Sequence, residues 1–172
     1  NSPERNNALP YLLELSSVQR NSFLPKDAVE SLQQAASILR GSDEQDKLID
    51  VLFKIEALHD QLGRRSEQQV ILLDILTIAE SQNDKQNMVR GLLRKANYLE
   101  RISDFDESKK ICSDAIRISK DKANGFMLGQ LHRQLGRNFY SRAAWKESLE
   151  HYEEAHRQAV NSGDRQLELE CL

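Results

Sequence analysis

Two rows of polar and basic residues are the clearest candidates for chemistry in this sequence. Arginine dominates the first row, which consists of Arg90, Arg94, Asn97 and Arg101. The second row follows about 40 residues later and consists of Gln130, Arg133, Arg137 and Tyr140. Intervals of three and four residues place each row on one face of a helix. Guanidinium groups about one turn apart take carboxylates bidentately, so the rows predict a binding surface for an acidic peptide or for the C-terminus of a partner protein.

The alternative interpretation of these rows is a solvated helix face whose arginine stems cover apolar neighbours. The distribution of charge along the sequence helps to choose between a binding surface and such a face. Residues 85–142 carry 13 Lys and Arg against 6 Asp and Glu, a net charge of +7, whereas residues 1–84 and 143–172 carry −6 and −4. Such asymmetry concerns partners rather than fold. We do not expect nucleic-acid binding, because the whole protein has a net charge of −3 and a pI near 5.9.

Residues suited to catalysis or metal binding do not form a recognisable constellation. No two of the four histidines have the spacing that places both rings on one metal ion from one helix; they are His59, His132, His151 and His156. The sequence also lacks a Cys-x-x-Cys pair, a phosphate-binding glycine loop and a Gly-x-Ser-x-Gly turn. We therefore predict no catalytic residues, no metal site and no cofactor. Trp145 and Tyr152 are predicted to fill gaps between helices, and His132 to pack with one hydrogen bond.

The helices that must position the two arginine rows begin at regular intervals. Asp84, Asn124 and Asp164 each open a helical pattern, and Glu44 is a poorer copy of the same start, so the starts lie 40 residues apart. Gly, Ser, Asn and Pro mark the breaks between patterns. The predicted helices span 7–20, 26–40, 45–62, 66–81, 84–102, 105–120, 125–142 and 145–161, with another opening at Asp164.

Small and large residues also repeat at this interval. Small residues recur at 96 and 136, at 108 and 148, and at 115 and 155. Large or apolar residues recur at 99 and 139, at 105 and 145, and at 112 and 152. Ala28, Leu32 and Ala35 continue the pattern towards the N-terminus, while the copy in between is degenerate, with Gln68, Leu72 and Ile75. Helices approach closely where small residues meet, so the pattern predicts stacked helical hairpins.

This pattern resembles the tetratricopeptide repeat in a variant with a 40-residue period. The matching residues are Leu135, Gly136, Phe139, Ser148, Tyr152 and Ala155. The resemblance implies an all-α, right-handed superhelix of about four hairpins plus a truncated helix. It implies one domain over 1–172, with repeats at 7–40, 45–81, 84–120 and 124–161 and a partial repeat at 164–172. In such arrays the first helix of each hairpin lines a concave groove, which would place both arginine rows side by side.

Function then follows as an expectation in two forms. The first is a non-catalytic scaffold that binds a partner peptide or protein in the groove. The second is a regulatory or sensor segment of a larger signalling or transcriptional protein. Arrays of this kind resemble those of bacterial regulators and of eukaryotic adaptors alike, so the sequence leaves both open.

The remaining features concern the surroundings and the ends of the protein. No apolar run is long enough to cross a bilayer, and Cys112 and Cys171 do not make a disulfide framework, so we expect a reducing, cytoplasmic setting. The last predicted helix has only the nine residues 164–172, too few for an independently stable helix. Leu167, Leu169, Cys171 and Leu172 would form an apolar end. We expect either further repeats after this end or its pairing with a second copy of the protein.

Overall fold

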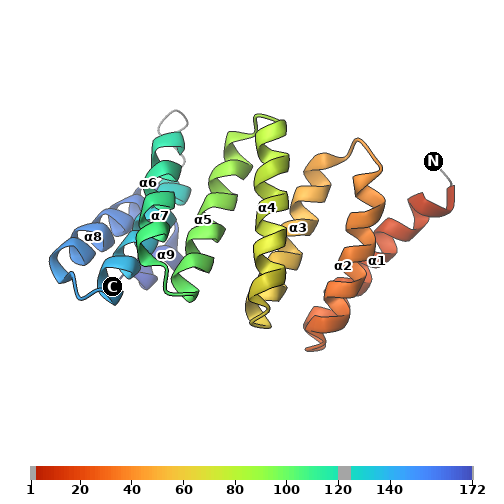
Figure 1. The fold of residues 1–172 in the computed structure, drawn as a ribbon, viewed down its shortest axis with the longest axis horizontal. Coiled ribbons are helices and arrows are strands. Elements are labelled where there is room, and N and C mark those ends of the chain that lie inside the picture. The colour runs from red at the N-terminus through yellow and green to blue at the C-terminus, as the bar shows by residue number, and fades with distance from the viewer. Residues whose placement is uncertain (1–2, 120–124, 172) are drawn as a thin grey trace. The chain divides into compact units, whose positions relative to one another are not determined.

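The computed structural model describes residues 3–119 and 125–171, with side chains from residue 8 onward (Figure 1). These residues fold into α-helices joined by short turns, and no strand occurs among them. The helices are α1 (Pro3–Asn21), α2 (Pro25–Arg40), α3 (Gln45–Gln61), α4 (Arg65–Ser81), α5 (Lys85–Arg101), α6 (Phe105–Ser119), α7 (Gly125–Ser141), α8 (Trp145–Ser162) and α9 (Arg165–Glu170).

The predicted helices are confirmed, and their ends agree to within one residue except at the start of α1. This helix begins at Pro3 rather than near residue 7 and carries Pro10 inside it. Asp84 caps α5 by accepting a hydrogen bond from the Asn87 N–H at 3.0 Å. Asp164 caps α9 in the same way, with the Leu167 N–H at 3.1 Å. Glu44 stands at the start of α3 without a capping bond from its side chain, and the predicted cap Asn124 lies outside the described residues.

Residues with left-handed backbone recur in the turns at intervals of 20 or 40 residues. A positive φ of 52–70° occurs at Phe23, Gly63, Asn83, Ser103, Ala143 and Gly163. In most of these turns, the residue that follows the left-handed residue donates its N–H to the carbonyl five positions earlier in the helix. Ala144, for example, donates to the Phe139 carbonyl at 3.0 Å. This bond satisfies a carbonyl that the helix end leaves without a partner. The 40-residue period of the sequence is therefore two helix-and-turn units of 20 residues.

The protein divides into two compact units, residues 1–82 and 83–172. In the first unit α1 packs on α2, α2 on α3 and α3 on α4. Its core consists mainly of aliphatic residues, including Leu32, Leu39, Leu48, Ile49, Leu52, Ile55 and Ile75. The degenerate copy adds a polar contact to the apolar packing of its helices, because buried Gln68 donates to buried Glu56 at 2.7 Å. Arg65 in turn donates to Gln68 at 2.6 Å, which satisfies the buried amide oxygen.

In the second unit the 40-residue pattern becomes a repeated contact. The Ser108 hydroxyl donates to the Ala96 carbonyl at 2.8 Å, and the Ser148 hydroxyl donates to the Gly136 carbonyl at 2.9 Å. A Cβ atom added at Gly136 would stand 3.0 Å from the Tyr152 ring, so only glycine allows this approach without displacing the ring. The small residues predicted at the helix crossings are thus confirmed in α5–α6 and α7–α8.

Two predictions about apolar residues in this unit need correction. Trp145 does not fill a gap between helices: it is 59% exposed and lies edge-on to Tyr140, with ring centroids 5.1 Å apart. Leu167 is not part of an exposed apolar end, because it is fully buried against Gly129. Leu169 is exposed as predicted, and Leu172 lies outside the described residues. The difference arises because α9 packs on α8 within its first turn and uses Leu167 as its anchor.

Candidate binding surface

The two arginine rows lie on α5 and α7, and these two helices pack against each other in the second unit. On α5, Arg90, Arg94 and Asn97 are half-buried, and Arg101 at the end of the helix is exposed. The second row on α7 begins with half-buried Gln130 and ends with Tyr140, which is 60% exposed. The structure thus brings both rows into the same unit on neighbouring helices. Binding by this surface remains a prediction.

Two arginines of the α7 row already hold carboxylates of the protein itself. Arg137 pairs with Glu100 of α5 at 2.9 Å, and Arg133 pairs with Glu170 of α9 at 3.1 Å. Each guanidinium has five N–H donors, so one such contact leaves most of its hydrogen-bonding capacity for another acceptor. The side chains of Arg133 and Arg137 are 26% and 36% exposed, which leaves them accessible to an added carboxylate.

Glu100 is the residue of this surface that the sequence pattern did not reveal. Its side chain is 13% exposed and is held on one oxygen by Arg137 and on the other by the Gln134 amide at 2.9 Å. Gln134 also donates to Asn138 at 3.2 Å, and Asn138 donates to Ser108 at 2.8 Å. This series of hydrogen bonds fixes how α7 lies on α5 and α6. The helical spacing of Glu100 within α5 gives no sign of it, because its partners belong to the next hairpin.

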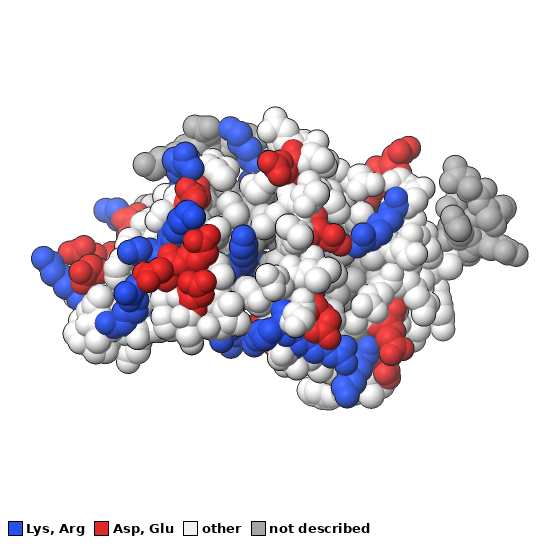
Figure 2. Space-filling model, viewed as in Figure 1, with Lys and Arg blue, Asp and Glu red and all other residues white. Residues whose placement is uncertain are grey.

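On α6 and α8, several charged residues pair within one turn of their own helix. On α6, Lys110 pairs with Glu107 at 3.4 Å and Arg117 pairs with Asp114 at 2.9 Å. Figure 2 shows the corresponding mixture of basic and acidic side chains where α6 faces the viewer. Such exposed pairs contribute little free energy and neutralise each other locally. The ion pairs of Arg133 and Arg137 instead run between helices, as does the more exposed pair of Arg142, just after α7, with Asp106 of α6.

A histidine pair lies between α7 and α8, on residues that the sequence did not bring together. The Nδ1 atoms of His132 and His151 are 3.1 Å apart, and the His151 ring stacks on Phe139. Burial, with smaller contributions from His151 and Arg157, lowers the pKa of His132 to about 4. Burial also lowers the pKa of His151, against a smaller opposing effect of Glu150. The prediction that His132 packs with one hydrogen bond is confirmed.

Metal-binding clusters and membrane spans do not occur in the described part of the protein. Among its residues, no three His, Cys, Asp or Glu side chains are grouped so that they could hold a metal ion. None of the helices formed by these residues is both long enough and apolar enough to cross a membrane. Cys112 and Cys171 are both free thiols, and burial raises the pKa of Cys112 to about 12.

Known structures confirm the tetratricopeptide-like helical repeat fold. The protein superposes on aspartyl phosphate phosphatase F from Bacillus subtilis with a TM-score of 0.85 at 13% identity, covering 99% of this chain and 45% of that one. It superposes on a signal-transduction ATPase with a tetratricopeptide repeat sensor from Pyrococcus horikoshii with a TM-score of 0.74 at 16% identity, covering 93% and 24%. At these identities the likeness concerns the fold.

Sequence comparison gives a weaker likeness. The protein is 22% identical over 139 residues to the 43 kDa receptor-associated protein of the synapse from Gallus gallus, covering 81% of this chain and 34% of that protein. No protein-family model matches the sequence. The 172 residues therefore span about a third of the length of this curated relative, and less than half of each structure named above.

Proposed function

We propose that this protein is a non-catalytic interaction scaffold whose basic surface on α5 and α7 binds an acidic segment of a partner protein. The basic surface consists of Arg90, Arg94, Asn97, Arg101, Arg133, Arg137 and Tyr140. The observation that carries the proposal is the pairing of Arg133 and Arg137 with carboxylates from neighbouring helices. Glu170 and Glu100 occupy the guanidiniums in the way that side chains of an acidic peptide would.

Binding of an acidic partner exchanges one carboxylate for another at the arginine side chains. Glu170 is the last residue of α9 and its side chain is 33% exposed, so its contact with Arg133 forms in a wet, screened environment and contributes little to stability. A peptide that brings several carboxylates along both rows gains several such contacts at once. Local positive charge also speeds the approach of an acidic partner. We place this function in a reducing, cytoplasmic compartment, as the free thiols suggest.

The proposal is tested by fluorescence anisotropy with a labelled decapeptide of alternating Glu and Gly, and with its uncharged Gln and Gly counterpart. We expect the acidic peptide alone to bind. Arg133→Gln should weaken binding about three- to tenfold, because a charge-assisted contact is lost. Arg117→Gln removes the same charge from the exposed side of α6 and is the matched control, with no change expected. Equal affinities of the two variants and the parent protein would rule the basic surface out.

The second candidate function is a regulatory segment within a larger signalling or transcriptional protein. The observation in its favour is that two proteins with this fold are a phosphatase and an ATPase with a repeat sensor, whose lengths are matched over only 45% and 24%. Under this function, peptide binding changes the arrangement of helices and passes that change to another part of the protein. Scattering curves with and without the acidic peptide separate the two candidates, since a passive scaffold keeps its dimensions.

A further inference from the structure

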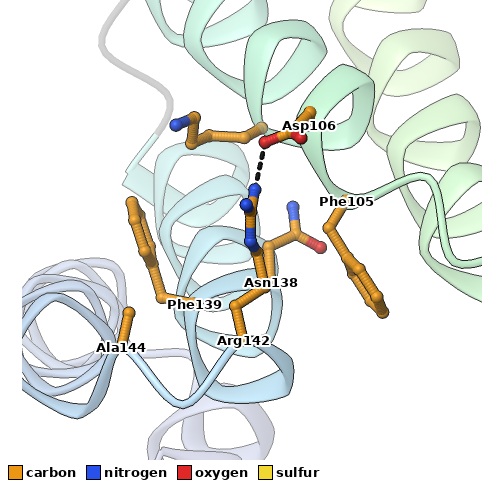
Figure 3. A pocket seen from close by; sticks show the side chains of 7 residues that line it. Phe105, Asp106, Asn138, Phe139, Arg142 and Ala144 are labelled. Carbon is orange, nitrogen blue, oxygen red and sulfur yellow. Dashed lines mark hydrogen bonds and ion pairs between the residues drawn. The ribbon is translucent and has the colours of Figure 1, made fainter.

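A pocket between α6 and α7 is a feature of the second unit that the functions proposed above do not use. It has a volume of about 310 Å³ and is lined by both helices and by the turn that follows α7. Figure 3 shows Phe105 and Phe139 on opposite sides of Arg142 and Asn138. Helix α6 packs on α5 and helix α7 packs on α8, so this α6–α7 pocket lies between two helical hairpins.

The first unit contains the same helix contact with other residues. There α2 packs on α3, and Val29, His59 and Leu62 stand 80 residues before Lys109, Phe139 and Arg142. Val29 and His59 are each 2% exposed, and Leu62 packs against the apolar core. In the second unit Lys109 and Arg142 are instead exposed, and Phe139 is half-buried. The α6–α7 pocket is therefore a property of these residues rather than of the repeat.

Two cations at the mouth of the pocket replace two aliphatic side chains of the first unit. Arg142 forms an ion pair with Asp106, which is drawn as a dashed line in Figure 3. Among the residues that the structure describes, Lys109 has no acidic partner, and its ammonium lies 5.7 Å from the centroid of the Phe139 ring. Two positive side chains and one negative one leave the mouth with a net charge of +1, which suits a ligand with one negative charge.

The walls of the pocket are held in place by contacts outside it. The Phe139 ring stacks on the His151 ring, with centroids 5.3 Å apart and planes 14° from parallel. Asn138 donates to the Ser108 hydroxyl at 2.8 Å and accepts a hydrogen bond from Gln134 at 3.2 Å. A ligand therefore meets a preformed site and does not have to order it, which lowers the cost of binding.

We propose that the α6–α7 pocket binds a small aromatic carboxylate. The aromatic ring would pack against Phe139, and the carboxylate would lie at the mouth between Lys109 and Arg142. Arg142 keeps donors for this contact, because a guanidinium has five N–H groups and the pair with Asp106 is exposed to water.

The size and charge of the pocket limit the ligand further. A volume of about 310 Å³ is at the lower end for ligand pockets, so a single ring with a short chain fits and a nucleotide does not. A phosphate ester carries a second negative charge, which Asp106 opposes. A neutral ring would lose the contacts with both cations.

The test is an NMR titration of the backbone amide signals with 3-phenylpropionate and with the uncharged 3-phenylpropionamide. We expect the acid to shift the signals of Phe105, Lys109 and Phe139, with a dissociation constant on the order of 1 mM for so small a ligand. The amide should bind about three- to tenfold more weakly, because it lacks the charge-assisted contacts.

Single variants assign the contact to the mouth of the pocket. Lys109→Gln should weaken binding of the acid about three- to tenfold and leave that of the amide unchanged. Lys110→Gln is the matched control, since the neighbouring ammonium pairs with Glu107, and no change is expected. Asp106→Asn removes the opposing charge and should strengthen binding of the acid about two- to fivefold. Arg133→Gln should change neither affinity, which separates this proposal from the one for the basic surface.

A double variant gives the pocket the residues of the first unit. Lys109→Val with Arg142→Leu should lower the affinity for the acid at least tenfold and remove the preference for acid over amide. Circular dichroism checks that this variant folds; if it does not, Lys109→Gln at its exposed position decides.

Three results would overturn the proposal. The first is equal affinity of the parent protein for acid and amide. The second is an equal effect of Lys109→Gln and Lys110→Gln. The third is a set of shifts confined to the surroundings of Arg133 and Arg137, which would place the acid on the basic surface.

Discussion

At the scale of single residues, the molecule combines contacts that the repeat requires with contacts that it does not. Ser108 and Ser148 make the same hydrogen bond between the two helices of consecutive hairpins, at 2.8 and 2.9 Å. The His132–His151 contact has no such counterpart at the positions 40 residues earlier, Leu92 and Ile111. One Nδ1 must donate and the other must accept, so the contact needs two neutral rings in opposite tautomers or one shared proton. Protonation of both rings breaks it.

This requirement predicts a loss of stability in mild acid. The pKa of His132 is about 4 in the folded protein and 6.5 when unfolded, so between these values the unfolded protein binds more protons. The contribution of His132 to the free energy of unfolding is therefore present above pH 6.5 and is lost as the pH falls towards 4. We expect about 2 kcal/mol from this pair, less than the full pKa difference gives because the rings are only half-buried.

Urea unfolding at pH 7 and pH 5 measures this effect. His132→Asn should reduce the difference in unfolding free energy between the two pH values. His156→Asn, on the same helix as His151, is the control and should retain the difference seen in the parent protein. A difference that His132→Asn leaves unaltered would mean that other groups cause the acid sensitivity.

Sequence spacing could identify faces within a helix but not partners across helices. The arginine rows were found because their intervals match the helix period. Glu100 was missed because its partners lie 34 and 37 residues away, at offsets that depend on how far α7 is shifted along α5. Trp145 was misplaced for a related reason. Its repeat position matches Phe105, which is half-buried beside α7, and the corresponding cover is absent among the described residues.

At the scale of elements, the turns set the repeat and carry local strain. Left-handed backbone costs a residue with a Cβ atom about 1 to 2 kcal/mol, whereas glycine adopts it freely. Gly63 and Gly163 meet this requirement, but Phe23, Asn83, Ser103 and Ala143 have the same sign of φ with a side chain. The sequence predicted the breaks from Gly, Ser and Asn, and it gave no sign that Ala143 is left-handed, because alanine is normally a helix former.

Exchanging residues at two equivalent turns tests this account. Ala143→Gly should stabilise the protein by up to about 1 kcal/mol, because relief of backbone strain exceeds the added entropy of the unfolded state. Gly63→Ala should destabilise it by about the same amount, since a Cβ there meets open space and only the backbone conformation is unfavourable. Thermal unfolding of both variants gives the signs. Two shifts in the same direction would refute the argument from strain.

At the scale of the whole molecule, one segment of the sequence carries a net charge opposite in sign to that of the whole protein. The protein has a net charge of −3, while residues 85–142 alone carry +7. An acidic partner is therefore attracted to one segment and repelled by the others, which favours a defined orientation of approach. Because the arginines are partly exposed, this attraction is screened by salt.

The measurement that tests the basic surface most directly is an NMR titration of the arginine side chains with the acidic decapeptide. The Nε–Hε signals of Arg90, Arg94, Arg101, Arg133 and Arg137 should shift together and saturate at one peptide concentration, and the shifts should diminish at high salt. The signals of Arg40 and Arg117 should stay in place. Shifts spread equally over all arginines, or confined to Arg40 and Arg117, would contradict the account.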